Sequence, residues 1–142
     1  MVAASPPERY EALSAGGSDT VAGLDVLRVA IPRDGGEPDT LPVVRVRTRG
    51  GATGYAFSGR DCDVPDRREL GRDTRARVVG RDLASLCAGA ARTPFARGAV
   101  EHALWDALGT LQGRPVSALL GATTTRLRAY VTCVWPGRPD QE

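Results

Sequence analysis

Alternating apolar and polar residues predict β-strands in the first half of the chain. The first strand covers residues 24–31, where aliphatic side chains at odd-numbered positions share one face. We expect Pro32 to end this strand, because proline removes a donor from the backbone ladder. Residues 33–40, rich in Asp, Gly and Pro, are then expected to form a polar loop.

The next two strands are predicted to form a hairpin. Valine and threonine alternate with arginine over residues 41–49, which gives one apolar and one wet face. A glycine-rich turn at 50–54 leads into a short strand at 55–57. Three strands that follow one another without a helix between them imply an antiparallel meander.

The second half of the chain has helical periodicity. We expect helices near residues 67–79 and 82–91, and then a longer one with Thr93 as N-cap and Pro94 in its first turn. Gly113 should end that helix, and a shorter one should run from Pro115 to Gly121. The apolar stripe of the long helix comprises Val100, Ala103, Leu104, Ala107, Leu108 and Leu111.

Three strands followed by helices define an α+β fold, a meander with a helical bundle. Residues 1–20 lack apolar periodicity and are expected to be a mobile tail. A last strand is predicted at 127–134, beyond the helices and without a strand after it to pair with.

Composition narrows the function classes without choosing one. The net charge of +2 is too balanced to argue for nucleic acid, and no apolar run approaches the roughly 20 residues of a membrane span. The start of the chain lacks the basic and apolar regions of a secretory signal. The cysteines, Cys62, Cys87 and Cys133, are few and widely spaced. This pattern indicates a reducing compartment, so we expect a cytoplasmic protein.

Two residue types limit the possible chemistry. All nineteen basic residues are arginine, so no lysine is available as a base or for a Schiff base. His102 is the only histidine, which excludes a metal site built from several histidines.

Several short motifs resemble one enzyme family in order and in spacing. The segment from Ala99 to Gly109 contains Ala-Leu-Trp-Asp, and Gly-Arg-Pro-Val and Leu-Leu-Gly-Ala follow it before an Ala-Tyr pair that ends at Tyr130. Residues 49–55 and 79–82 fit the same pattern. The chain resembles the mandelate racemase/muconate lactonizing enzyme family of the enolase superfamily.

The resemblance implies a capping domain, 21–125, that lies over the mouth of a barrel. Members of this family abstract a proton next to a carboxylate, and Mg²⁺ stabilises the enediolate that forms. They include racemases, cycloisomerases and acid-sugar dehydratases. The resemblance also implies three carboxylate metal ligands and a Lys-x-Lys base, all carried by the barrel.

The chain lacks parts of the family pattern that catalysis requires. A sequence without lysine has no Lys-x-Lys motif, and residues 126–142 correspond only to the first strand of a truncated barrel. We therefore expect no catalytic residue, no metal ligand and no cofactor in this chain, and no catalysis by the chain alone. Its expected partners are the missing barrel domain or further copies of itself, with a small carboxylic or sugar acid as the substrate of the complete enzyme.

A second interpretation keeps the capping fold without the enzyme. In it the chain is an interaction module, and the surface that would face a barrel binds a partner instead. The motivation is the apolar sequence after Leu111, which a lone capping domain cannot fully cover.

The resemblance places candidate substrate contacts in two loops, 33–42 and 57–65. Tyr55, Phe57 and Arg60 are the candidates there, because an arginine can hold a carboxylate by two parallel hydrogen bonds. The alternative is that the two aromatic residues are strand core and that Arg60 is solvated.

Thr132 is a further candidate, from the first barrel strand. An ordinary hydroxyl in a packed barrel interior is the alternative.

Two other features have ordinary structural explanations. His102 and Asp106 are four residues apart on one helix, which suits a surface pair opposite the apolar stripe better than a catalytic dyad. The arginines at 67–81 interleave with acidic residues, which is typical of an exposed, salt-bridged helix and not of a nucleic-acid surface.

Overall fold

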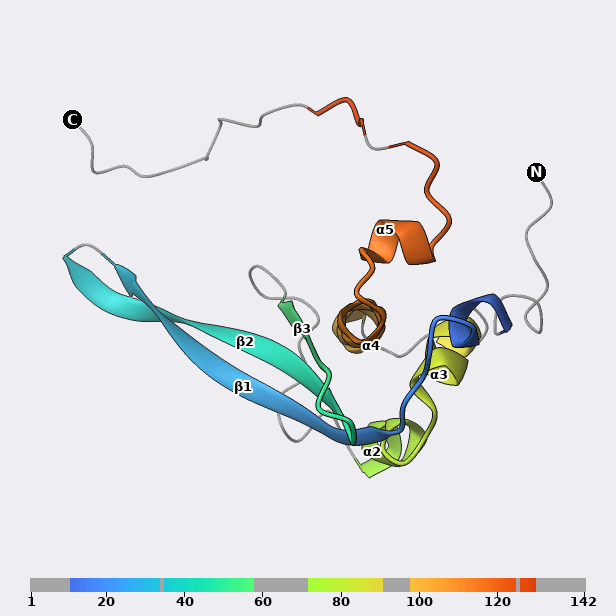
Figure 1. Cartoon of the computed structure of the whole chain (residues 1–142). Helices are drawn as coiled ribbons and strands as arrows, with labels where there is room; N and C mark the ends of the chain where they lie inside the picture. Colours follow the sequence, from blue (N-terminus) through green and yellow to red (C-terminus); the bar gives the residue numbers. More distant parts are fainter. Residues whose placement is uncertain (1–10, 34, 58–71, 91–97, 125, 130–142) are drawn as a thin grey trace.

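A computed structural model describes residues 11–33, 35–57, 72–90, 98–124 and 126–129 of the chain (Figure 1). Within these ranges a three-stranded sheet is followed by helices, which confirms the predicted α+β fold. In chain order the elements are β1 (Val21–Arg33), β2 (Gly36–Thr48), β3 (Thr53–Phe57), α2 (Arg72–Val78), α3 (Leu83–Ala90), α4 (Gly98–Gln112) and α5 (Val116–Leu119).

The sheet is the predicted antiparallel meander, in the order β1-β2-β3. β2 and β3 join through a tight turn in which Gly51 has a φ of 96°, a value that favours glycine. The alternation in β2 is also confirmed: Val44 and Val46 are buried, while Arg45 and Arg47 lie on the other face.

The first hairpin is longer than expected. β1 continues through Pro32 to Arg33, and β2 begins at Gly36, so most of the predicted loop 33–40 is strand. The tight turn between them contains Gly35, whose φ is 74°. In Figure 1 the outer part of this hairpin projects beyond the helices.

The pairing of β1 with β2 explains why Pro32 does not end β1. The N–H of Tyr55 donates to the carboxylate of Asp106, so it points away from β2. Arg45, opposite Tyr55, must then direct its backbone groups toward Asp25 on β1. This direction alternates where the register is continuous, from Gly23 to Ile31, so the even-numbered residues of that part face the open edge. Pro32 lies beyond it, at the register shift between Ile31 and Arg33, where it has no partner residue on β2, so its missing donor breaks no regular pair.

The core lies between the inner face of the sheet and α4. Leu24, Val44 and Val46 from the sheet pack with Leu104 and Leu108 from the helix, and all five are fully buried. The predicted stripe of α4 is confirmed: five of its six members are buried and the sixth, at position 111, packs at the margin.

The predicted end of α4 is also confirmed. Gly113 has a φ of 60°, and the N–H of Arg114 donates to the carbonyl of Gly109 to close the helix end. α5 follows directly after Pro115. The predicted N-cap and first turn at 93–94 lie outside the described residues.

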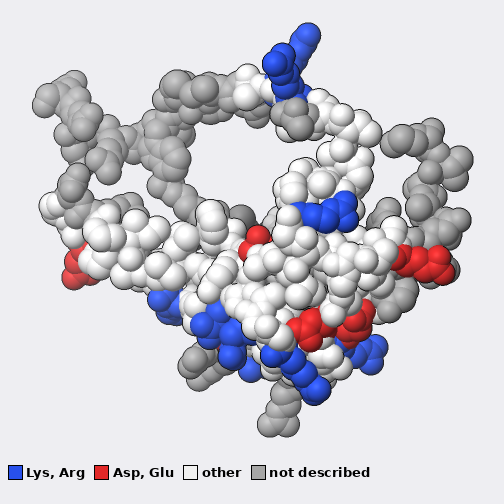
Figure 2. Space-filling view, in the orientation of Figure 1, with Lys and Arg blue, Asp and Glu red and all other residues white. Residues whose placement is uncertain are grey.

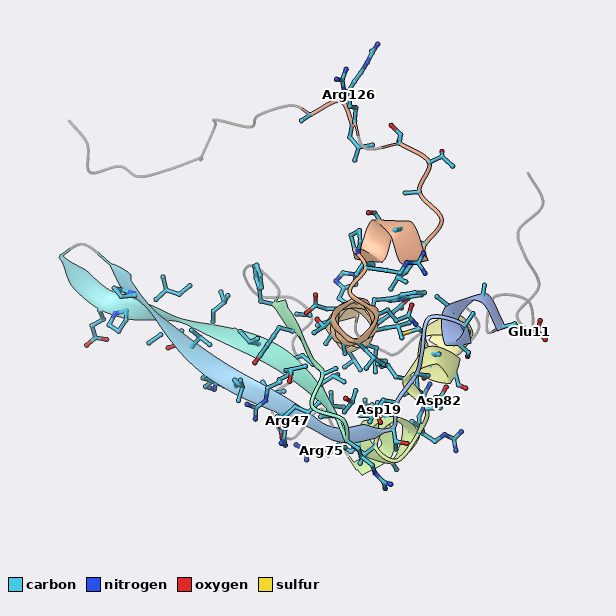
Figure 3. All side chains as sticks on the ribbon, viewed as in Figure 1. Glu11, Asp19, Arg47, Arg75, Asp82 and Arg126 are labelled. Atoms are coloured by element: carbon cyan, nitrogen blue, oxygen red, sulfur yellow. The ribbon has the colours of Figure 1, made fainter. Side chains whose placement is uncertain are left out.

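Asp82 joins three segments at the base of the sheet. Its carboxylate accepts the N–H of Ser85, as the N-cap of α3, and the hydroxyl of Ser18 at 2.5 Å. Burial alone would raise the pKa of Asp82, but these hydrogen bonds outweigh it and lower that pKa. Asp19, which lies close by in Figure 3, accepts the N–H of Gly50.

Part of the predicted tail is packed against the core. Leu13, in a helical turn at 11–14, is buried, and the side-chain amide of Gln112 donates to the carbonyls of Leu13 and Gly17. Residues 1–10 lie outside the described part.

The last described residues have no regular structure. Residues 127–129 are not in a strand and Leu127 is 86% exposed. The rest of the predicted strand, 130–134, lies outside the described residues, so that strand stays a prediction.

Candidate functional site

β3 presents two aromatic side chains on the outer face of the sheet. Tyr55 is 50% exposed and Phe57 is 68% exposed, whereas Gly54 and Ala56 between and beside them are buried. The alternative that both aromatics belong to the core is therefore wrong. The small residues of β3 face α4, and the large ones face solvent.

The close approach of α4 explains this distribution. A Cβ at position 54 would collide with the carbonyl of Ala103 and the amide of Ala107, so only glycine allows β3 to lie this close to the helix. One turn along, the Asp106 carboxylate accepts the N–H of Tyr55 at 2.8 Å. These contacts fasten the outer edge of the sheet to α4 and fix the face from which Tyr55 and Phe57 project.

The Ala-Leu-Trp-Asp motif at 103–106 is therefore structural in this chain. Ala103 meets the glycine of β3, Leu104 and Trp105 are buried, and Asp106 holds the strand. No hydrogen bond joins His102 to Asp106, although both are described. The prediction that the two form a surface pair is wrong, because the carboxylate faces β3 instead of lying opposite the core.

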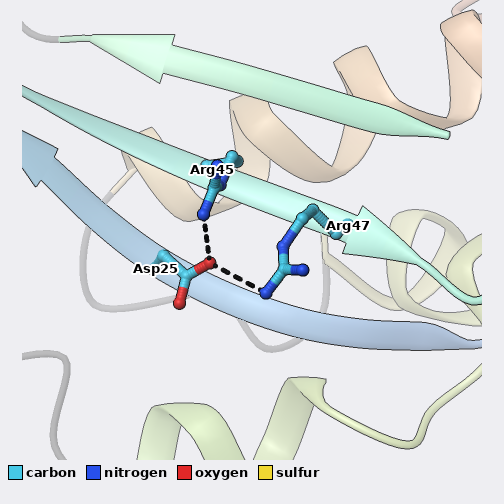
Figure 4. Close-up of polar contacts among 3 residues, drawn as sticks. All are labelled: Asp25, Arg45 and Arg47. Carbon is cyan, nitrogen blue, oxygen red and sulfur yellow. Dashed lines mark hydrogen bonds and ion pairs between the residues drawn. The ribbon is translucent and has the colours of Figure 1, made fainter. Parts of the chain in front are cut away.

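A charged cluster borders the aromatic pair. Arg45 lies opposite Tyr55 in the β2–β3 register, and its guanidinium donates to the Asp25 carboxylate at 3.0 Å. Arg47 donates to the same oxygen, Oδ2, at 3.3 Å (Figure 4). Burial acts to raise the pKa of Asp25, but the two guanidinium groups outweigh it and lower that pKa.

Beyond this cluster the outer face is apolar. Val43 lies opposite Phe57 on one side and Leu27 on the other. Farther out, Val29 and Ile31 are each 43% exposed. The described part of the site is thus a strip of aromatic and aliphatic side chains beside an arginine pair.

Of the four predicted substrate-contact residues, the structure brings together Tyr55 and Phe57. Arg60 and Thr132 lie outside the described residues, as does the loop 57–65 after Phe57. The predicted loop 33–42 is wrong as a loop, since its residues from Gly36 onward belong to β2.

The site offers no metal centre in its described part. No three His, Cys, Asp or Glu side chains gather closely enough in that part to hold a metal ion. Cys87 is buried in the core, and this burial raises the pKa of its thiol to about 12, which suits packing and not reactivity.

The charged surface carries both signs. Arg75 and Arg77 on α2 are exposed, and Figure 2 shows acidic side chains together with basic ones on the same face. The described helices include none with the length and hydropathy needed to cross a membrane.

A three-stranded antiparallel meander followed by helices is the α+β fold of the capping-domain class. The family comparison agrees with this class. The model of the family "Mandelate racemase / muconate lactonizing enzyme, N-terminal domain" matches residues 29–121. The chain belongs to this family, within the enolase superfamily.

A solved structure has the same fold. The muconate cycloisomerase from Azorhizobium caulinodans superposes with a TM-score of 0.54 and 24% sequence identity. The match covers 73% of this chain and 31% of that enzyme, so the chain spans less than a third of the enzyme's length. None of the curated proteins compared with the chain matches it significantly.

Proposed function

We propose that this chain supplies the substrate-capping part of an enzyme that removes a proton next to a carboxylate, as a racemase, cycloisomerase or acid-sugar dehydratase. The family match supports the capping assignment. The exposure of Tyr55 and Phe57 on a strand held rigidly by α4 is the observation that carries the lid role. An apolar strip beside arginines suits a small organic acid, since it offers both a dry contact surface and positive charge.

The proton-transfer groups of that enzyme lie outside these 142 residues in this proposal. The sequence has no lysine to act as base, and the described part has no cluster of metal ligands. The chain's own residues contact and orient the acid and exclude water from it, while a barrel with its Mg²⁺ performs the chemistry. The chain is then a part of such an enzyme and not a complete one.

A chimera tests the lid role. Residues 21–125 replace the matching N-terminal part of the muconate cycloisomerase from Azorhizobium caulinodans, and turnover of muconate is measured with Mg²⁺. We expect activity above that of the barrel alone, and a lower kcat/KM when Phe57→Ser is introduced. A folded chimera no more active than the barrel alone would contradict the proposal. Arg49→Ser, away from the strip, is the control expected to leave kcat/KM unchanged.

A non-enzymatic interaction module is the second candidate. The observation that favours it is the exposure of two large aliphatic side chains after α4, Leu120 at 61% and Leu127 at 86%. This candidate predicts that Leu120→Ser abolishes binding to a partner protein without changing the fold. The capping proposal instead predicts that Leu120→Ser weakens docking to the barrel in the chimera.

A further inference from the structure

A short segment before β1, residues 13–19, contacts elements that lie far from it in the sequence. We call this segment the strap. It lies outside residues 29–121, the range that matches the family model. Figure 1 shows it in dark blue, beside α3 and leading to the start of β1. Leu13, at its beginning, is 3% exposed and belongs to the hydrophobic core, so the strap is packed as part of the domain.

The end of the strap holds α3 and the turn between β2 and β3. The N–H of Leu83 donates to the carbonyl of Asp19 at 2.9 Å. The N–H of Ala84 donates to the hydroxyl of Ser18 at 3.0 Å. The N–H of Gly50, in the turn after β2, donates to the Asp19 carboxylate at 2.6 Å. These three backbone amides, at positions 50, 83 and 84, are the reporter amides, because each has its acceptor on the strap.

One side chain of α4 holds the beginning of the strap. Nε2 of Gln112 donates to the carbonyl of Leu13 at 2.6 Å and to the carbonyl of Gly17 at 2.7 Å. Both protons of the side-chain amide are thus used on the strap. Between these two points lies Gly16, where an added Cβ would collide with the same amide. Gln112 therefore joins the end of α4 to the strap.

Docking of the strap leaves two polar atoms without partners. The hydroxyl of Ser14 and the Oε1 atom of Gln112 are buried, and neither has a hydrogen-bond partner among the described residues. Burying such an atom unpaired costs free energy, and this cost disappears when the strap leaves. A segment held by few bonds and burdened in this way opens more readily than the sheet and α4 do.

We propose that the strap opens and closes as one unit, with Gln112 as its latch, and so couples the end of α4 to α3 and to the β2–β3 turn. Gly17, which the latch holds, directly precedes Ser18 and Asp19, so the chain has no slack between the latch and the other contacts. When the strap opens, Leu13 leaves the core and the three reporter amides lose their acceptors together. This device does not depend on the proposed capping function.

Amide hydrogen exchange of the full chain, followed by NMR, tests the latch. Gln112→Glu keeps the size of the side chain but replaces the donating amide with a carboxylate, which repels the two carbonyls. We expect exchange at the reporter amides to accelerate by about tenfold or more, although none of them is bonded to Gln112. Exchange at Leu108, in the middle of α4, should change by less than about twofold.

Glu101→Gln is the matched control for the latch variant. It exchanges a carboxylate and an amide on the same helix, at a side chain that makes no hydrogen bond with the described residues, and it should leave the reporter amides unchanged. Acceleration confined to residues 13–17, or no acceleration in Gln112→Glu, would overturn the proposal. Equal acceleration at Leu108 would overturn it too, because the strap would then open only with the whole domain.

Ser14→Ala tests the same device in the opposite direction. It removes the unpaired hydroxyl, so the docked strap becomes more stable and exchange at the reporter amides should slow by about fivefold or more. This variant decides the matter even if Gln112→Glu prevents folding. Unchanged or faster exchange at the reporter amides in Ser14→Ala would refute the idea that the buried hydroxyl favours opening of the strap as a unit.

Discussion

The two faces of the sheet differ in what covers them, although the same strands form both. On the inner face Leu24, Val44 and Val46 belong to the same core as the buried residues of α4 and are almost fully inaccessible. On the outer face Phe57 and Val29 remain open to solvent although they are equally apolar. Side-chain hydrophobicity alone therefore does not identify the core of this domain. The position of α4 does, and the remaining apolar residues are available for recognition.

Replacing Leu104 with alanine should have the largest effect on the inner face. The side chain is fully buried between helix and sheet, so its loss leaves a cavity. We expect the free energy of unfolding to fall by about 2–5 kcal/mol, measured by urea denaturation. Leu104→Met, which conserves volume, should lose less than about 1.5 kcal/mol. A loss below that for the alanine variant would show that α4 does not anchor the sheet.

Gly54→Ala tests the close approach of β3 to α4. The added Cβ collides with backbone atoms of the helix, which cannot move away as a side chain can. We expect a loss of about 1–3 kcal/mol in the same assay. Gly36→Ala is the matched strand control, because a Cβ there meets nothing, and it should change stability by less than about 0.5 kcal/mol. Equal effects of the two variants would refute the argument.

Asp106→Ala should loosen the outer edge of the sheet. The substitution leaves the N–H of Tyr55 without its acceptor, which costs about 1–3 kcal/mol when such a group stays shielded from water. Amide hydrogen exchange at Tyr55 should accelerate accordingly. Asp106→Asn keeps a carbonyl oxygen in place and should restore most of the protection. Unchanged exchange in the alanine variant would mean that the carboxylate does not hold β3.

Acid should weaken the base of the sheet through Asp82. Hydrogen bonds from Ser18 and Ser85 lower its pKa below the ordinary 3.8 despite burial. Because the pKa of Asp82 is lower in the folded than in the unfolded chain, its ionised form stabilises the fold above pH 3.8. This stabilisation is lost as the pH falls through the pKa of the folded state. We expect Asp82→Asn, still a good N-cap, to depend less on pH between 5 and about 2 than the unmodified chain. Parallel stability curves would contradict this.

Phe57→Ser should have the smallest effect on stability, less than about 0.5 kcal/mol, because the side chain is largely exposed. Its inner neighbour gives the contrast: Ala56→Leu overfills a buried position and should cost about 1–3 kcal/mol. If Phe57→Ser destabilises the domain as much as Ala56→Leu, the two faces do not differ as described.

Local periodicity was enough to predict most of the fold. The alternation over 41–49 gave β2 its two faces, and the stripe from Val100 to Leu111 gave the buried side of α4, because both patterns depend on neighbours along the chain. The length of the first hairpin could not be predicted this way. Whether Pro32 breaks a strand depends on whether the ladder needs a donor at that position, and only the assembled sheet decides that.

The sequence predicted which residues of β3 share a face, but it did not predict which elements pack against that strand. The strand period places Tyr55 and Phe57 on one face, but it does not say which face a helix covers. The role of Asp106 was missed because its partner is a backbone amide 51 residues away. The sequence signal that could have revealed this contact is Gly54, because a glycine inside a strand indicates that another backbone approaches it closely.

The most direct test of the capping assignment is solvent deuterium exchange at the carbon next to the carboxylate. The purified chain is incubated in D₂O with Mg²⁺ and with mandelate or a sugar acid, and loss of the α-proton signal is followed by NMR. We expect exchange no faster than in buffer, because in the proposed function the chain covers such an acid while a barrel supplies the base. Exchange above the buffer rate would show that the 142 residues carry proton-transfer chemistry of their own, and it would contradict the account.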